Sequence, residues 1–98
     1  MSAEHLAKFR ERLNGIDEQL ISLLGERFEI CRDVADVKKE RDIPMMQSGR
    51  VHEVKARCKK LGEQHRVAPE FIEDLYTLII GEACRLEDDI IDATDAAT

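Results

Sequence analysis

Two cations interrupt or flank an otherwise apolar helical pattern in the first half of the chain. Apolar residues recur at gaps of three and four from Leu6 to Leu23 and again from Ile30 to Val37. Arg27 occupies the position between these runs where the pattern calls for an apolar side chain. A buried guanidinium without a counter-ion costs several kcal/mol. We therefore expect an anion to meet Arg27, either a carboxylate elsewhere in the core or a bound ligand.

Lys38 and two further arginines extend this argument toward a small anionic ligand. Lys38 follows Arg27 by eleven residues on the same side of the expected helix, about 16 Å along its axis. Their long side chains can converge on one ligand of about ten heavy atoms or slightly more. Arg50, at the start of the next helix, could close the same pocket. Arg10 lies about 25 Å before Arg27, so it could reach only the pocket of a partner chain in an antiparallel dimer.

Glu87 is the carboxyl that falls closest to the buried stripe of the last expected helix. It follows Ala83 by four residues and Ile80 by seven, next to a small side chain that leaves room. Two structural alternatives stay open from spacing alone. Glu87 could form a salt bridge with one of the arginines, or it could be exposed within the acidic run of residues 87–89.

Three helices, one very long, one short and one medium, must position these residues. The pattern predicts them over residues 3 to about 40, from 47 or 48 to about 61 or beyond, and from 69 to about 91. Pro44 ends the first helix, Ser48 is a plausible N-cap, Gly62 is a candidate C-terminal stop, and Pro69 suits a first helical position. The small acidic tail of residues 92–98 is expected to fray.

The first helix is too long for a globule made by its own chain. It would be more than about 50 Å long, whereas a compact domain of this size is about 35 Å across. Its apolar seam must therefore meet another copy. We expect an all-α protein with a single domain over residues 1–98, assembled as an intertwined homodimer around paired first helices.

Composition narrows the function classes. The net charge of −6 argues against nucleic acid as a partner, because phosphate binding needs a basic face. No apolar run approaches the roughly 20 residues that span a bilayer, and no apolar signal region follows Met1, so we expect a cytoplasmic protein. Cys31, Cys58 and Cys84 lie in apolar patterns and are expected to be buried free thiols rather than disulfides or metal ligands.

Over residues 5–91 the chain resembles the all-helical chorismate mutases of the AroQ class. The resemblance lies in the run LNGIDEQLISLLGER at residues 13–27, in residues 34–38, in Ile43-Pro44 followed by Arg50, in the Leu61-Gly62 junction, and in FIEDLYTLIIGE at residues 71–82. It implies a Claisen rearrangement of chorismate to prephenate in the shikimate pathway of aromatic amino acid biosynthesis. It implies no cofactor and no metal.

The resemblance also assigns roles to individual residues. Arg10 of a neighbouring subunit and Arg27 would hold the substrate carboxylates, with Arg50 as the third arginine. Lys38 would donate to the ether oxygen of the breaking bond. Glu87 would be the second donor to that oxygen, at a position where many relatives have glutamine.

Three pocket positions depart from the family pattern. Val51 stands where many mutases have a glutamate near the ring hydroxyl, Gln47 where a bacterial relative has aspartate, and Ala83 where a serine occurs. A valine beside the arginine resembles isochorismate-pyruvate lyases and the mutases that act on aminodeoxychorismate, so both activities are alternatives. A catalytically inert helical dimer that serves as an interaction module is the non-enzymatic alternative.

Overall fold

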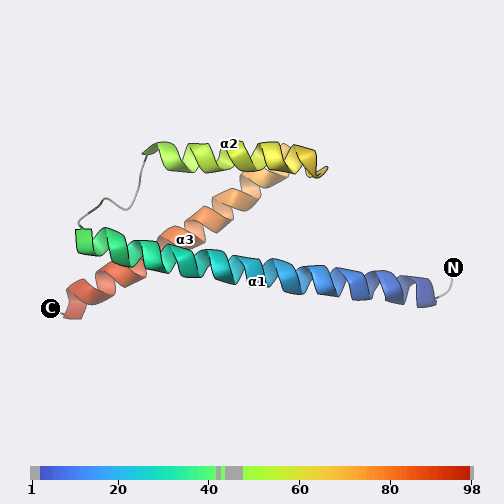
Figure 1. Cartoon of the computed structure of the whole chain (residues 1–98), viewed down its shortest axis with the longest axis horizontal. Coiled ribbons are helices and arrows are strands. Elements are labelled where there is room, and N and C mark those ends of the chain that lie inside the picture. Colours follow the sequence, from blue (N-terminus) through green and yellow to red (C-terminus); the bar gives the residue numbers. More distant parts are fainter. Residues whose placement is uncertain (1–2, 42, 44–47, 98) are drawn as a thin grey trace. The chain divides into compact units, whose positions relative to one another are not determined.

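The computed structural model describes residues 3–41, 43 and 48–97, and these form three helices. Helix α1 spans Ala3–Arg41, α2 spans Ser48–Gln64, and α3 spans Pro69–Ala97 (Figure 1). No strand occurs in the described ranges. The all-α prediction is confirmed, and so are the start and the approximate end of the first helix. Pro44, which was expected to end the first helix, and Gln47, a predicted pocket residue, lie outside the described residues.

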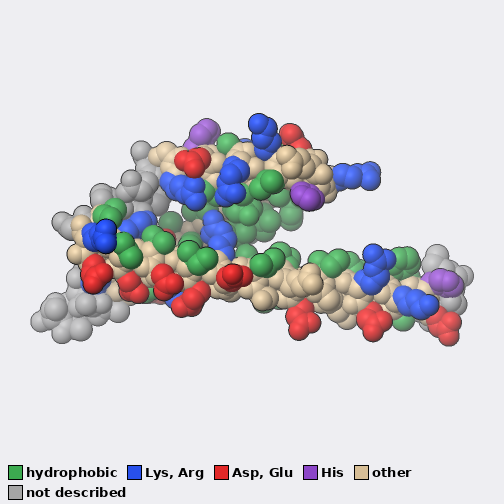
Figure 2. All heavy atoms as spheres, viewed as in Figure 1, with side chains coloured by type: hydrophobic (Ala, Val, Ile, Leu, Met, Phe, Trp, Pro, Cys, Tyr) green, Lys and Arg blue, Asp and Glu red, His purple; other side chains and the backbone are tan. Residues whose placement is uncertain are grey.

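The chain divides into two compact units, and the first, residues 1–30, contains the N-terminal part of α1. The apolar seam along this part is exposed, and the exposed fractions of its side chains lie between 44% and 62%. The seam consists of Leu6, Phe9, Leu13, Ile16, Leu20 and Leu23. Figure 2 shows apolar side chains at the surface of α1 along one edge and acidic side chains along the other. This unit buries none of its seam residues against itself.

The second unit, residues 31–98, contains the end of α1 together with α2 and α3. Its core cluster consists of Val54 and Cys58 from α2 and Ile72 from α3. Burial of such side chains contributes about 25 cal/mol per Å² of apolar surface. Ala35, near the end of α1, is fully buried, at 0% exposure. The expected apolar faces of the second and third helices are therefore the ones that pack.

The junction between α2 and α3 differs from the expected glycine stop. Gly62 lies within α2, which continues to Gln64, and the left-handed conformation falls on Arg66, at φ 62°. The Val67 amide donates to the Gly62 carbonyl at 2.8 Å, and the Arg66 amide donates to the Glu63 carbonyl at 3.3 Å. These two bonds form a Schellman motif with arginine in place of the usual glycine.

Gly62 has a packing role instead. A Cβ atom there would lie 2.8 Å from Cγ1 of Ile72, so the absence of a side chain lets α3 approach α2 closely. Pro69 is the first residue of α3, as predicted.

The end expected near Ile91 is too early, because α3 extends to Ala97. Residues 92–97 contain no proline or glycine, and the alanines among them favour helix. The fraying expected for this tail stays a prediction. In the described part of the chain, no helix is long and apolar enough to cross a membrane.

Candidate active site

Lys38 and Glu87 form an ion pair between the end of α1 and α3. The Lys38 Nζ atom lies 3.2 Å from Oε1 of Glu87, and the two side chains are only 16% and 10% exposed. Both structural alternatives for Glu87 were therefore wrong, since it is buried and its partner is a lysine rather than an arginine. Two predicted site residues that lie 49 positions apart in the sequence come together in the second unit.

Each member of this pair follows a buried alanine on its own helix. Ala35 precedes Lys38 by one turn, and Ala83 precedes Glu87 by one turn; their exposed fractions are 0% and 5%. Lys39 provides a second link, because its Nζ atom donates to the backbone carbonyl of Ile91 at 2.9 Å. Sequence reasoning missed this contact, since no side-chain pattern marks a lysine whose acceptor is a backbone carbonyl.

Two half-buried thiols belong to the same two helices. Cys84 precedes Glu87 by three residues, and Cys31 precedes Lys38 by seven. Burial raises the pKa of the Cys84 thiol, and the charges of Glu87 and Asp88 raise it further, while Lys38 acts in the opposite direction.

All three cysteines are free thiols. Full burial, however, was predicted correctly only for Cys58, because Cys31 and Cys84 are half-buried. In the described residues, no three Cys, His, Asp or Glu side chains are grouped to hold a metal ion.

The arginines lie in different settings. Arg10 is exposed on the first unit, whereas Arg27 is half-buried there, although Leu23 and Ile30 beside it in the seam are 62% and 57% exposed. Arg50 is on the surface of α2, with its side chain 59% exposed and an Nη1 atom 2.9 Å from Oε1 of Glu53. The next residue, Val51, is half-buried.

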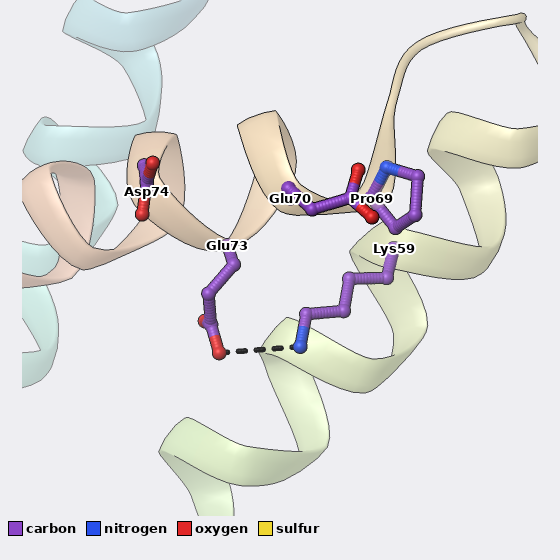
Figure 3. A pocket seen from close by; sticks show the side chains of 5 residues that line it. All are labelled: Lys59, Pro69, Glu70, Glu73 and Asp74. Carbon is purple, nitrogen blue, oxygen red and sulfur yellow. Dashed lines mark hydrogen bonds and ion pairs between the residues drawn. The ribbon is translucent and has the colours of Figure 1, made fainter.

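An open hollow of about 310 Å³ lies elsewhere, where α2 faces the start of α3 (Figure 3). Its lining residues are Lys59, Pro69, Glu70, Glu73 and Asp74. In Figure 3 the Lys59 ammonium points to the carboxylate of Glu73, at 3.2 Å. Lys55 and Lys59 lower the pKa of this carboxyl by hydrogen bonding. The hollow contains no predicted site residue, and its ion pairs join α2 to α3.

The Lys38–Glu87 pair is suited to stabilise charge rather than to attack a substrate. An ammonium offers three hydrogen-bond donors, and a carboxyl offers one when it is protonated. Donors fixed in a largely buried setting stabilise negative charge that develops on a nearby oxygen. The pair has no nucleophile and base arrangement of the kind used in covalent catalysis.

The chain is similar in sequence to known mutases of chorismate and of 4-amino-4-deoxychorismate. The family model for chorismate mutase type II matches residues 9–88, a range that contains all eight predicted site residues. A 4-amino-4-deoxychorismate mutase from Streptomyces pristinaespiralis is 34% identical over 92% of this chain and 70% of its own length. A protein of the same name from Streptomyces venezuelae is 35% identical over 85% of this chain and 81% of its own length. A chorismate mutase from Methanocaldococcus jannaschii is 26% identical over 93% of this chain and 92% of its own length.

Proposed function

The chain belongs to the chorismate mutase type II family, and from this premise we propose that it converts chorismate to prephenate by Claisen rearrangement. It is an isomerase of that family. The observation that supports the proposal most directly is the buried pair of Lys38 and Glu87, which lies within the matched range. In this reaction the ether C–O bond breaks while a C–C bond forms in the same molecule.

Such a rearrangement needs positioning and charge stabilisation, not a nucleophile. The enzyme must hold a flexible dicarboxylate in its compact reactive conformer and stabilise negative charge on the ether oxygen. Lys38 donates to that oxygen directly. Glu87 accepts from Lys38 in the structure and can donate to the ether oxygen only after it gains a proton. Substrate binding therefore exchanges a lysine–carboxylate contact for two contacts to the ether oxygen.

Three arginines hold the substrate carboxylates in this proposal. Arg27 and Arg50 come from one chain, and the third is the partner's Arg10. Guanidinium groups bind carboxylates through charge-assisted and often bidentate hydrogen bonds. Arg50 must leave Glu53 to do so, and an exposed pair of this kind contributes only about 0–1 kcal/mol. Gln47, Val51 and Ala83 are proposed to line the remaining pocket, around the substrate ring.

The homodimer is part of the same proposal. The seam of the first unit exposes six large apolar side chains at regular helical spacing, which is the pattern of helices that pair. Arg10→Ala and Arg27→Ala homodimers should each lose several kcal/mol of transition-state stabilisation. A mixed dimer of the two variants has one intact site, so random 1:1 mixing should restore about a quarter of the wild-type activity. No recovery on mixing would reject the shared site.

A second candidate substrate is 4-amino-4-deoxychorismate. Val51 places no carboxylate where many mutases have glutamate, and two relatives that are 34% and 35% identical have the name 4-amino-4-deoxychorismate mutase. The ring substituent near Val51 would then be an amine rather than a hydroxyl.

One experiment separates these activities. The purified protein is incubated with chorismate, 4-amino-4-deoxychorismate and isochorismate in parallel, and the products are identified by liquid chromatography and mass spectrometry. We expect prephenate from chorismate, abolished in Lys38→Met. Turnover of the amino compound alone would favour the second candidate, and pyruvate release from isochorismate would indicate a lyase. Neither binding nor turnover of any of them would indicate an inert helical dimer.

A further inference from the structure

Two consecutive lysines at the end of α1 reach two successive turns of α3. Lys38 pairs with the Glu87 carboxylate at 3.2 Å, and Lys39 donates to the Ile91 carbonyl at 2.9 Å. Glu87 and Ile91 are four residues apart, which places them one helical turn apart on the same side of α3. Lys38 is a donor in the proposed reaction, whereas Lys39 has no role in it so far.

The Lys39 contact is suited to hold a helix rather than a ligand. A main-chain carbonyl has two lone pairs, so the Ile91 oxygen can accept from the ammonium in addition to its helical hydrogen bond. Lys39 and Ile91 are both half-buried, and a hydrogen bond from a charged donor is stronger than one between neutral groups. Because the acceptor belongs to the main chain, the bond fixes the backbone of α3 relative to the end of α1.

The turn of α3 that contains Glu87 is held on both sides. One turn before it, Ala83 is buried, at 5% exposure. One turn after it, Ile91 accepts the bond from Lys39. Asp88 and Asp89, which follow Glu87 directly, are exposed. The position of the Glu87 carboxyl against α1 therefore depends on the Lys39 contact as well as on the ion pair with Lys38.

The exchange of contacts in the proposed reaction gives the Lys39 bond its use. Lys38 and Glu87 both turn to the ether oxygen when the substrate binds, so their ion pair no longer joins α1 to α3. The bond from Lys39 to Ile91 involves neither of these side chains and can stay in place. We propose that Lys39 is a positioning residue, which keeps the turn of Glu87 aligned with α1 while Lys38 and Glu87 donate to the substrate. This inference rests on the proposed function.

Lys39→Met tests the role of the hydrogen bond, because it removes the donor and keeps a side chain of similar length. A misplacement of about 1 Å can cost about a hundredfold in rate, so we expect kcat to be lower by about tenfold or more. KM for chorismate should change by less than about twofold, since the arginines that hold the carboxylates are untouched. Unchanged kcat in the folded variant would overturn the proposal. A change confined to KM would do the same, because it would indicate a general attraction between the Lys39 charge and the dicarboxylate.

Two further variants separate the hydrogen bond from other effects of a cation. Lys39→Arg keeps a charged donor that can reach a carbonyl, so it should restore most of kcat. Arg41→Met is the matched control, because Arg41 is exposed in the same last turn of α1 and also lies at the negative end of the helix dipole. Its kcat should equal that of the natural chain. Equal losses in Lys39→Met and Arg41→Met, or no recovery in Lys39→Arg, would contradict the proposal.

Hydrogen exchange tests the anchoring without turnover. Amide exchange of the segment 84–91 is followed by peptide mass spectrometry in each variant. This segment should exchange faster in Lys39→Met, by about threefold or more, and at the natural rate in Arg41→Met. An unchanged rate in Lys39→Met would refute the anchoring. Absence of mutase activity in the natural chain would reject the proposed function instead, and the exchange rates would still decide whether Lys39 holds α3.

Discussion

Replacement of Glu87 by glutamine separates two roles that this carboxyl combines. In the structure it accepts a hydrogen bond from Lys38 at 3.2 Å, and in the proposed reaction it donates one. Glutamine has the same shape, always carries N–H donors and never ionises. The variant should therefore lose stability, because the ion pair is gone, and gain activity at alkaline pH, because its donor cannot be deprotonated.

The size of both effects follows from the burial of the pair. The two side chains are 16% and 10% exposed, so Glu87→Gln leaves a largely buried ammonium without its counter-charge. Breaking a buried ion pair costs about 3–5 kcal/mol, and the hydrogen bond that the amide oxygen still accepts from Lys38 offsets about 1.5–3 of this. We expect the variant to be about 2 kcal/mol less stable, which lowers Tm by about 10 °C in a domain of this size.

Activity that depends on a protonated Glu87 falls as pH rises, by up to tenfold per pH unit, whereas the activity of Glu87→Gln does not depend on this proton. Two other groups bear on the interpretation of this slope. Lys38 is the same in both proteins. The pKa of the Cys84 thiol is raised above its ordinary 9.0, so its ionisation does not produce a slope between pH 6 and 8. Any difference between the two profiles in this range therefore belongs to Glu87.

The assay is kcat/KM for chorismate from pH 5 to 9, together with thermal unfolding followed by circular dichroism. Glu82→Gln is the matched control, because Glu82 is also on α3 and pairs with Arg85 at 2.8 Å, but near the surface. It should change stability little, because exposed ion pairs contribute little, and it should keep the natural pH profile. A natural-chain rate that is constant from pH 5 to 8, or a Glu87→Gln profile with an unchanged slope, would refute the donor role of Glu87.

Three further substitutions test the junction between α2 and α3, and a fourth, Gly81→Ala, is the control for the glycine. In urea unfolding, Gly62→Ala should be destabilised by about 1–3 kcal/mol, because its Cβ would lie 2.8 Å from Cγ1 of Ile72. A Cβ at Gly81 would have no atom within 4 Å, so Gly81→Ala should be about 1 kcal/mol more stable than the natural chain. Arg66→Gly should be stabilised by about 1 kcal/mol, since glycine adopts φ 62° without strain, and an unchanged midpoint would argue against this. The ionised carboxylate of Glu73 stabilises the fold above its ordinary pKa of 4.5, and this contribution is lost as pH falls through the lowered value. Glu73→Gln should therefore show a shallower loss of stability on acidification.

Most of the fold was predictable because proline and periodicity mark it clearly. Pro69 begins α3, and the apolar spacing identified the faces that bury Val54, Cys58 and Ile72. The errors concern local backbone geometry. A glycine near a helix end suggested a stop, but the close approach of α3 required its small size within the helix, and the left-handed residue came four positions later at Arg66. Sequence spacing does not distinguish these two uses of glycine.

The candidate site was predictable in its residue types but not in its pairing. Helical spacing placed Lys38 and Glu87 on inward faces, yet which cation meets Glu87 depends on how α1 and α3 are aligned. That alignment involves contacts with no periodic signal, such as the bond from Lys39 to the Ile91 carbonyl.

The buried pair also argues for function on energetic grounds. Taking an ammonium and a carboxylate out of water costs several kcal/mol per ion, and apolar side chains of the same volume often give equal or greater stability. The residues one turn before Lys38 and Glu87 are buried alanines, Ala35 and Ala83. A charge pair in such a setting is a poor way to stabilise two helices. It is a suitable way to keep two hydrogen-bonding groups fixed and largely dry, where they act on an oxygen that gains negative charge.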